Sequence, residues 1–509
     1  MNKEVFSCKY LINSFLTHRE KWRAVSIYNS DCKLDEIISL LKDVKRTVRF
    51  IGVLGSGMLP LALIMRERGY RVSGYDRGID SILAPSINVG QRVGPIARLR
   101  NAGVDLCTHE NVDWATVSLA VYSLAIDEND AEILAVKSHG ISMISRAQLL
   151  GALMSEAQTR ISVSGSHGKS TTTAIMDHIL TQADKSPTTV SGAHLSSGNT
   201  YSLGSGGIFL AEACEYKDSF LRLCPTHQII TSVELDHTDY FPSLNAYRES
   251  FLTACRRAET VIINRDDAIA ASIADELKKE SNTHTRRILT YGESEVCDYR
   301  FSIKEVRDGI TYFDVVFGER VYALKTSLMG KFNLYNITAA VALSDMLGVS
   351  YETIREAVDS FCSIDRRLTE ITSIDHIPVY YDYAHHPTEI KAVIFALKER
   401  YGTVTVIFRP HTYSRTYSLW NDFISALSKA DFTILLDIYP AREKEIDGVN
   451  SKRLAELING AVYTDNLGAV DHALKAHTGA IALLGAGDVN SIKEKLISLG
   501  KKSEKTYEE

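Results

Sequence analysis

The sequence lacks the features that would send the chain into a membrane or out of the cell. No stretch approaches the roughly 18 consecutive apolar residues of a membrane-spanning helix. Lys9 and Asn13 interrupt any apolar run at the N-terminus, so no signal peptide is recognisable. The eight cysteines include no CxxC pair, which argues against a zinc site and a disulfide framework. These absences predict a cytoplasmic protein with reduced thiols and no membrane partner.

The chain also has no large excess of positive or negative charge. The formal net charge is −6 over 509 residues, and it provides no basic surface of the kind that binds nucleic acid. Hydrophobic residues make up 45% of the chain and charged residues 24%, an ordinary balance for a globular protein. At about 150 residues per domain, the length predicts three domains.

Strand-like and helix-like segments alternate from residue 49 onward, as in "RFIGVLGSG", "LPLALIMRERGY" and "RVSGYD". Such alternation predicts parallel sheets and an α/β fold class. We expect a leader over residues 1–48 with one amphipathic helix near Leu34, and then three domains. These are a Rossmann-like N-terminal domain over 49–152, a central α/β domain over 153–365 and a C-terminal Rossmann-like domain over 366–500.

The segment "ISVSGSHGKSTTTA", residues 161–174, has the order strand, Gly-rich turn, lysine, helix. Val163 occupies the place of the first glycine of the longer Walker pattern, so only the shorter G-x-x-G-K-S remains. In such a loop, backbone N–H groups and the helix dipole hold phosphates, the lysine neutralises charge and the serine can bind Mg²⁺. The central domain is therefore predicted to be of the P-loop ATPase type. Its predicted phosphate-binding residues are Gly165, Ser166, His167, Gly168, Lys169, Ser170 and Thr171.

Ionisable side chains follow two further strand-like runs of the central domain. Glu212 lies at the end of the apolar strand in "GGIFLAEA", and His237 comes shortly after "HQIITSV". The carboxyl ends of parallel strands open onto one crevice, where the phosphate loop also lies. Glu212 is therefore a candidate ligand for Mg²⁺, which prefers oxygen. For His237, the residues alone favour a structural hydrogen-bonding role.

A second Gly-rich turn lies in "GVLGSGMLPLA", after the first strand of the chain, and Asp76 ends the next strand. The spacing is similar to a dinucleotide fingerprint, in which glycines let the backbone approach a diphosphate. Pro60 is compatible with the first turn of the following helix. Two interpretations stay open for this turn: a nucleotide-diphosphate site, or a plain strand–helix connection.

The ordered motifs "GSHGKSTTT", "ELDHTDYF", "GKFNLYNITAA", "DYAHHPTE", "PHTYSRT" and "YPAREKEIDGV" resemble those of the Mur ligase family, over roughly residues 49 to 495. "DYAHHPTE" and "PHTYSRT" resemble the alanine-adding branch. The resemblance implies an ATP-dependent ligase of peptidoglycan precursor synthesis that is a monomer or homodimer. ATP, assisted by Mg²⁺, would convert the carboxylate of UDP-N-acetylmuramate to an acyl phosphate, which the amine of L-alanine then attacks.

The resemblance also implies roles for particular residues. The implied catalytic groups are Lys169, Glu212, His237, Arg367 and Asp382, and the implied metal ligands are Ser170, Glu212 and His237. Asn333, Asn336 and Arg367 would complete the ATP site. The implied UDP-sugar residues are Gly55, Ser56, Gly57, Met58, Asp76 and Ser123. The implied amino-acid pocket contains Tyr383, His385, His386, His411 and Arg415, with Arg415 as a bidentate clamp for an α-carboxylate.

Three positions depart from the family pattern. Leu54 and Pro60 replace glycines of the first turn, and Thr412 stands where many relatives have arginine. The alternatives are a related ligase for another amino acid or a murein peptide, a non-catalytic nucleotide-binding regulator, and a nicotinamide-dependent dehydrogenase built on the first turn. A dehydrogenase would assign no functional role to Lys169, Glu212 or the third domain.

Overall fold

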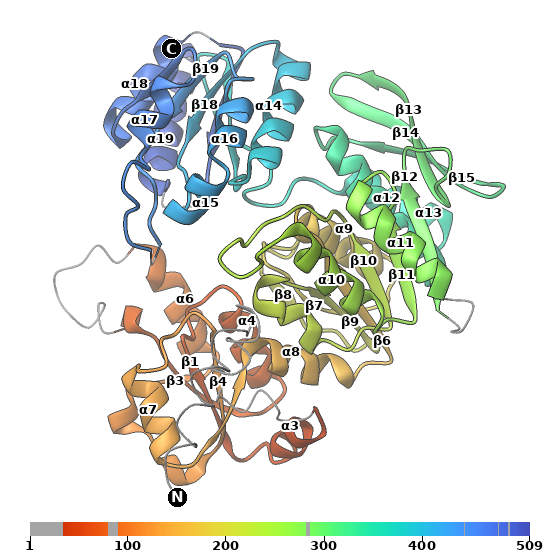
Figure 1. Cartoon of the computed structure of the whole chain (residues 1–509), viewed down its shortest axis with the longest axis vertical. Helices are drawn as coiled ribbons and strands as arrows, with labels where there is room; N and C mark the ends of the chain where they lie inside the picture. The colour runs from red at the N-terminus through yellow and green to blue at the C-terminus, as the bar shows by residue number, and fades with distance from the viewer. Residues whose placement is uncertain are drawn as a thin grey trace, which may run out of the picture.

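The structure is a computed structural model that describes residues 34–79, 90–280, 286–441, 443–476, 478–486 and 489–508. Three separate sheets, each with its own helices, follow one another along the chain (Figure 1). This confirms the predicted α/β fold class with parallel sheets. Most of the predicted leader, residues 1–33, lies outside the described residues.

The first sheet has five parallel strands in the order β3-β2-β1-β4-β5. The strands are β1 (Thr47–Ile51), β2 (Arg71–Tyr75), β3 (Asp105–Leu106), β4 (Val117–Tyr122) and β5 (Ser142–Ser145). The accompanying helices are α3 (Leu34–Leu41), α4 (Met58–Glu67), α6 (Gly90–Asn101), α7 (Ala131–Ser138) and α8 (Arg146–Ser155), with short 3₁₀ turns η1 (His109–Asn111) and η2 (Trp114–Thr116). The strand order reverses at β1, and the crevice beside such a switch point is where doubly wound sheets bind ligands. The first Gly-rich turn follows β1 directly.

Helix α3 packs against α8 and β4, so the end of the predicted leader is part of the first domain. Ile37 and Leu41 bury the apolar stripe that the sequence predicts for this helix. The predicted boundary between residues 152 and 153 falls inside α8.

The second sheet has ten strands in the order β15-β14-β13-β12-β11-β10-β6-β9-β7-β8. They are β6 (Thr159–Ser164), β7 (Thr188–Val190), β8 (Tyr201–Ser202), β9 (Ile208–Glu212), β10 (His227–Ile230), β11 (Thr260–Asn264), β12 (Arg287–Gly292), β13 (Tyr299–Arg307), β14 (Ile310–Phe317) and β15 (Arg320–Thr326). Its helices are α9 (Lys169–Gln182), α10 (Leu244–Cys255), α11 (Ala268–Glu280), α12 (Lys331–Met346) and α13 (Tyr351–Ser360), with the 3₁₀ segment η3 (Tyr216–Arg222). Strands β13 to β15 form an antiparallel meander that the sequence analysis did not anticipate. The hairpin signals were present, because Gly309 and Gly318 sit in the two tight turns with positive φ.

The third sheet has six strands in the order β16-β17-β21-β18-β19-β20, with β16 antiparallel at the edge. The strands are β16 (Thr369–Ile374), β17 (Ile377–Asp382), β18 (Val404–Phe408), β19 (Phe432–Leu435), β20 (Ala461–Tyr463) and β21 (Ala480–Leu484). The helices are α14 (Pro387–Tyr401), α15 (Tyr413–Ser418), α16 (Trp420–Leu427), α17 (Ser451–Glu456), α18 (Asn466–Lys475) and α19 (Asn490–Glu508). None of the helices in the described ranges is both long enough and apolar enough to cross a membrane.

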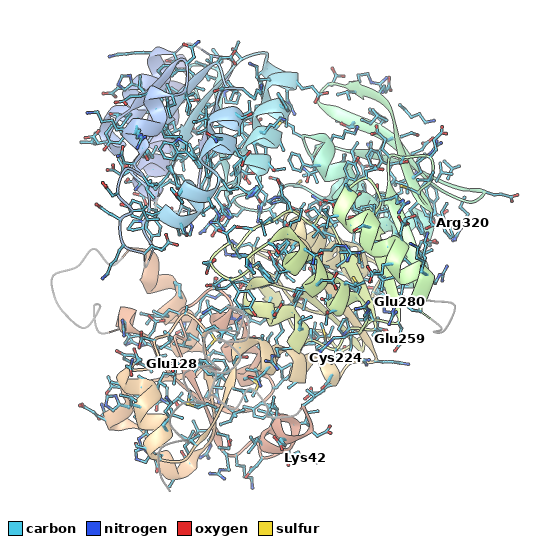
Figure 2. All side chains as sticks on the ribbon, viewed as in Figure 1. Lys42, Glu128, Cys224, Glu259, Glu280 and Arg320 are labelled. Atoms are coloured by element: carbon cyan, nitrogen blue, oxygen red, sulfur yellow. The ribbon has the colours of Figure 1, made fainter. Side chains whose placement is uncertain are left out.

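The first and second domains pack closely where α8 meets η3. Cys224, labelled in Figure 2, follows η3, and its thiol lies 3.7 Å from the carbonyl oxygen of Gly151 in α8. A Cβ atom on Gly151 would lie only 2.2 Å from the carbonyl oxygen of Arg222. The absence of a side chain at Gly151 therefore lets the two backbones approach.

A fully buried ion pair lies inside the first domain. Arg49 of β1 is 0% exposed, and its Nη2 lies 2.5 Å from a carboxylate oxygen of Glu132 in α7. The same guanidinium donates to Ser73 and to the carbonyl oxygen of Cys107, and the other oxygen of Glu132 accepts from the backbone N–H of His109. A charge buried without its partner is costly, so this pair ties α7 to the sheet.

We predict that Glu132→Ala destabilises the first domain by about 3 to 5 kcal/mol, because it leaves Arg49 buried and unpaired. Hydrogen-exchange mass spectrometry of peptides from β1 and β4 would measure the loss. The control is Glu156→Ala, which breaks a partly exposed pair with Arg68 and should cost less than about 1 kcal/mol. Equal protection in the two variants would contradict the prediction.

Candidate active site

The phosphate loop lies between β6 and α9 and is tightly enclosed. Gly165 and Gly168 have φ of 146° and 82°, conformations that residues with side chains rarely adopt. A Cβ atom on Gly165 would lie 2.0 Å from the hydroxyl of Thr231, and one on Gly168 would lie 2.4 Å from Oδ1 of Asn336. Glycine is therefore required at both positions, because the backbone conformation disfavours a side chain and neighbouring atoms leave no room for one. The 14-residue helix α9 begins at Lys169, directly after the loop.

Lys169 is held on the loop by three oxygen acceptors. Its Nζ donates to the carbonyl oxygens of Gly165 and Ser166, and it lies 3.0 Å from Oε1 of Glu215. Burial is the largest single effect and would lower the pKa of Lys169, but the neighbouring acidic groups, Glu215 foremost, together outweigh burial and raise that pKa above its ordinary value. The lysine is therefore a fixed positive charge at the start of α9.

Glu215 is the buried acid of this cluster, and it is not among the residues predicted from sequence. Its Oε1 lies 3.0 Å from Lys169 Nζ and 3.6 Å from His237 Nε2, and it accepts from the hydroxyl of Tyr247. Glu212, the acid selected from sequence, accepts instead from the backbone N–H of Gly192 at 2.6 Å. Glu215 stands three residues after Glu212 in the run "EACE", so an acid close behind the strand end was the available signal.

The hydroxyl of Ser170 is hydrogen-bonded to an arginine rather than to Glu212 or Glu215. Its buried hydroxyl accepts from Nη2 of Arg367 at 3.4 Å. The guanidinium of Arg367 also lies over the ring of Tyr383, 5.7 Å from its centre. Arg367 thus reaches from the third domain to the start of α9.

Two asparagines of α12 face the loop from the other side. Asn336 donates to Oδ1 of Asn333 at 3.2 Å and accepts from the hydroxyl of Thr172. Asn333 in turn donates to the carbonyl oxygen of Met329. Both side chains are buried, and the hydrogen bond between them shows that they lie on the same face of α12.

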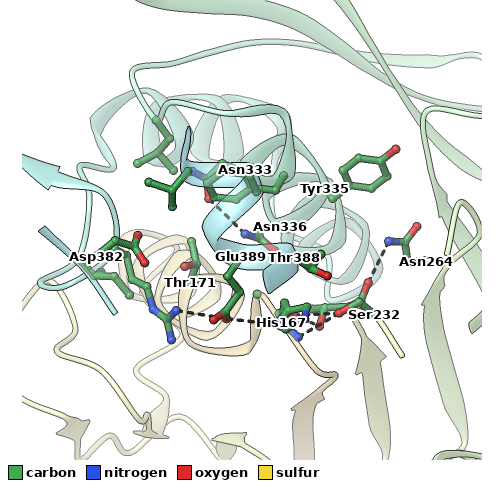
Figure 3. Close-up of a pocket in the computed structure, with 18 of the residues that line it drawn as sticks. His167, Thr171, Ser232, Asn264, Asn333, Tyr335, Asn336, Asp382, Thr388 and Glu389 are labelled. Carbon is green, nitrogen blue, oxygen red and sulfur yellow. Dashed lines mark hydrogen bonds and ion pairs between the residues drawn. The ribbon is translucent and has the colours of Figure 1, made fainter. Parts of the chain in front are cut away.

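A cavity opens between the phosphate loop, α12 and the third domain (Figure 3). Of the residues predicted from sequence, the lining includes His167, Gly168, Thr171, Asn333, Asn336, Arg367 and Asp382. Gly165, Ser166, Lys169 and Ser170 belong to the adjoining loop and helix start and do not line this cavity. Asp382 accepts from the backbone N–H groups of Leu368 and Ala384, and burial raises its pKa to about 6. The cavity therefore has walls from two domains.

Four of the five predicted amino-acid-binding residues lie together in the third domain. His385 lies between the rings of Tyr383 and His411, and His411 Nδ1 lies 3.3 Å from the guanidinium of Arg415. Arg415 is already engaged by a carboxylate of the second domain, since its Nη2 lies 3.0 Å from Asp236 Oδ1. Asp236 is a further residue that the sequence analysis did not assign.

His386 is separated from this group. Its ring lies 4.9 Å from that of His167, and its Nδ1 lies 3.8 Å from Glu234. Within the described ranges, one set of three histidine and carboxylate side chains has its potential ligand atoms all within 4.8 Å of one another, and it consists of His167, Glu234 and His386. It contains none of the ligands predicted from sequence.

The first Gly-rich turn lies at the carboxyl edge of the first sheet. Asp76 accepts from the backbone N–H groups of Leu54 and Gly78, so it braces the turn. Ser123 follows β4 and donates its backbone N–H to the carbonyl oxygen of Ile51. These contacts place Asp76 and Ser123 on either side of the turn.

An arginine from α8 lies against the same turn. A Cβ atom on Gly57 would come within 2.9 Å of Cδ of Arg146, so the arginine stem crosses the glycine. The side chain of Met58 is buried in the core, and its backbone N–H donates to Gly55. Arg146 is a cation near the turn that sequence spacing could not reveal.

The three departures from the family pattern have clear structural positions. Leu54 provides the N–H that Asp76 accepts, and Pro60 lies in the first turn of α4, which forms as predicted. Thr412 has φ of 66° and donates its N–H to the carbonyl oxygen of Tyr439. Positive φ is strained for a β-branched residue. The strain lies in the loop that presents His411 and Arg415.

A phosphate loop, a cavity beside it and a third domain that completes the cavity wall define a multidomain nucleotide-binding protein. Family models match most of the chain: "Mur ligase family, catalytic domain" over residues 47–158, "Mur ligase middle domain" over 163–344 and "Mur ligase, glutamate ligase domain" over 366–493. The chain belongs to the Mur ligase family.

Individual relatives agree with this family. The chain is 34% identical to the UDP-N-acetylmuramate–L-alanine ligase of Caldicellulosiruptor bescii, covering 87% of this chain and 96% of the relative. It is also 34% identical to the ligase of the same name from Clostridium acetobutylicum, covering 90% and 99%. The structure of UDP-N-acetylmuramate-alanine ligase from Thermotoga maritima superposes with a TM-score of 0.72 at 24% identity, covering 90% of this chain and 100% of that one.

We predict that the site histidines carry different charges at neutral pH. Burial, together with the nearby charge of Arg415, lowers the pKa of His385 to about 3 and that of His411 to about 4. For His167, burial is outweighed by two carboxylates, which raise the pKa to about 9. Imidazole ¹⁵N spectra, assigned with single His→Asn variants, should show His167 protonated at pH 7 and the other two neutral. Titration of His385 near pH 6.5 would contradict this.

Proposed function

We propose that the chain is an ATP-dependent ligase that joins the carboxylate of UDP-N-acetylmuramate to the amine of L-alanine. The observation that carries the proposal is the cavity walled by the phosphate loop, α12 and the third-domain residues Arg367 and Asp382. Mur ligase family membership supports the use of ATP, and the names of the full-length relatives support the two other substrates. We further propose that the enzyme works in the cytoplasm.

In this proposal the three domains each hold one reactant. The first turn, with Arg146 as a cation beside it, holds the diphosphate of the sugar nucleotide. The loop and the Asn333–Asn336 pair hold ATP. The group formed by Tyr383, His385, His411 and Arg415 holds the amino acid, and His386 belongs instead to the domain contact.

The chemistry follows from how poor a carboxylate is as an acyl donor. Transfer of the γ-phosphoryl group from ATP to the muramate carboxylate forms an acyl phosphate and ADP. The neutral amine of alanine then attacks the acyl carbon, phosphate leaves and the amide nitrogen loses a proton. Lys169 stabilises the charge on the transferred group, since phosphoryl transfer depends mainly on positioning and charge neutralisation.

The residues beside Lys169 fit a magnesium ion. Oε2 of Glu215 is buried without a hydrogen-bond partner among the described residues, and carboxylate oxygens are suitable Mg²⁺ ligands. We propose Ser170, Glu212 and His237 as the ligands, with Glu215 beside them. A bound Mg²⁺ ion supplies positive charge to the phosphate oxygens.

The direct test is phosphate release from ATP and Mg²⁺ by the purified protein, with UDP-N-acetylmuramate present and each amino acid offered in turn. We expect release that requires both the sugar nucleotide and L-alanine, together with an amide product of matching mass. Release with another amine or a murein peptide would keep the ligase and change its substrate. No release with any combination would contradict the proposal.

We predict that Lys169→Ala lowers the rate of amide formation at least about 100-fold, because one charge that stabilises the transferred group is lost. The control is Lys278→Ala, which removes an exposed lysine from α11 and should leave the rate unchanged. Binding of UDP-N-acetylmuramate, measured by calorimetry, checks that each variant is folded. A Lys169→Ala rate equal to that of the control would rule out the assigned role of the loop.

A further inference from the structure

The side chain of His167 in the phosphate loop contacts the third domain directly. The ring of His167 lies between two carboxylates that come from different domains, and Figure 3 shows it beside one of them, Glu389. Its Nε2 lies 3.1 Å from Glu234 of the second domain, and its Nδ1 lies 3.1 Å from Glu389 of the third. Two carboxylates cannot donate hydrogen bonds when ionised, so both ring nitrogens must carry protons. His167 is therefore an imidazolium that bridges the domains.

Glu389 uses its two oxygens for two different purposes. Oε2 accepts from the backbone N–H groups of His385 and His386, at 3.1 and 3.3 Å, and completes the capping box at the start of α14. Oε1 accepts from His167 and lies 4.0 Å from Nη1 of Arg367. A capping box needs only an acceptor, which glutamine supplies as well as glutamate. The charge of Glu389 therefore serves the contact with His167 rather than the helix.

The backbone of His167 is fixed by the second domain. Its N–H donates to the hydroxyl of Ser232 at 3.0 Å, and its carbonyl oxygen accepts from the hydroxyl of Thr231. A displacement of the His167 ring would therefore also displace the turn between Gly165 and Gly168. Thr388 adds to the same contact by donating to Glu234 at 2.6 Å.

The charges around His167 favour its protonated form. Burial opposes protonation, but the carboxylates of Glu389 and Glu234 outweigh it and raise the pKa of His167 to about 9. His386, the remaining ring in contact, has a lowered pKa because it is buried and lies beside the charged His167. The groups that face Glu389 in turn are His167, Arg367, His385 and Asp382.

We propose that Glu389 is a positioning residue that acts through His167, and that the pair ties docking of the third domain to the ATP-binding shape of the phosphate loop. This inference rests on the proposed ATP-dependent function. Both carboxylates line the cavity, where an anionic ligand would be repelled. The imidazolium offsets one of the two negative charges, so loss of its proton both weakens the domain contact and makes the cavity wall more negative.

The test is Glu389→Gln in the full chain, which keeps one acceptor oxygen for the capping box and replaces the charged oxygen that faces His167 with an amide NH₂. The readout is the affinity for a non-hydrolysable ATP analogue with Mg²⁺, which requires neither the sugar nor the amino acid. We expect affinity at pH 7 to fall about tenfold, because a charge-assisted hydrogen bond is lost. If Glu389 were only a negative charge facing the nucleotide, its removal would strengthen binding, and that result would overturn the proposal.

The pH profile provides a readout that a helix cap alone would not move. Because the pKa of His167 is raised from 6.5 to about 9, the contact is fully present below pH 6.5 and is lost as pH rises through about 9. In wild type, analogue affinity should fall only as pH approaches 9. In Glu389→Gln the fall should begin at least about one pH unit lower, since one of the two carboxylates that raise the pKa is gone. An unchanged profile would contradict a role through His167.

A double-mutant cycle tests whether the two residues act as one unit. In a His167→Gln background, Glu389→Gln should change affinity less than about twofold. Independent effects that multiply would overturn the proposal. His167→Gln leaves the capping box untouched, so its own loss of affinity tests the proposal even if Glu389→Gln fails to fold.

The matched control is Glu399→Gln, the same chemical change at an exposed position on α14, and it should bind as wild type does. Hydrogen exchange of α14 should be equal in all variants. If no amide forms with any substrate, the proposed ligase function fails, yet the analogue-binding cycle still decides whether Glu389 acts through His167.

Discussion

The close packing of the phosphate loop between the end of β10 and helix α12 is the constraint on which the rest of the site depends. Gly165 and Gly168 leave no room for side chains because Thr231 and Asn336 approach the loop directly. The loop cannot shift without moving α12, which carries the asparagine pair. The positions of Lys169 and of the cavity wall are consequently fixed together by the packing of the loop against α12.

Charge compensation across long sequence separations is the second feature of the site. Lys169 pairs with Glu215 over 46 positions, Arg415 with Asp236 over 179 and His167 with Glu389 over 222. Buried ion pairs contribute little net stability, but a partner left alone is costly. Such pairs therefore discriminate between arrangements of the domains, and the latter two pairs join the second domain to the third.

Much of the fold could be predicted from local pattern. Alternating strands and helices, the two Gly-rich turns and the apolar stripe of α3 depend on neighbouring residues, whose periodicity is visible in sequence. The antiparallel meander of β13 to β15 was missed, although Gly309 and Gly318 mark its turns. These turn glycines were not interpreted as hairpin turns, because a strict alternation of strands and helices was expected.

The site divides in a similar way. Motif positions such as Lys169, Asn336 and Arg367 could be selected from sequence because each stands in a short motif that resembles those of the Mur ligase family. Three acids could not be assigned, namely Glu215, Asp236 and Glu389, which pair with Lys169, Arg415 and His167. An acid becomes a partner only when folding brings it within hydrogen-bonding distance. Arg146 is the same case, because only the packing of α8 brings it to the first turn.

The sequence by itself determined the order of the elements, the positions of the glycines and the family to which the motifs belong, because these depend on residues close together in the chain. The tertiary structure alone decided which carboxylate meets which cation and that one histidine of the phosphate loop bridges two domains. The physical reason is that Coulomb and hydrogen-bond energies depend on distances through space, which sequence separation does not encode.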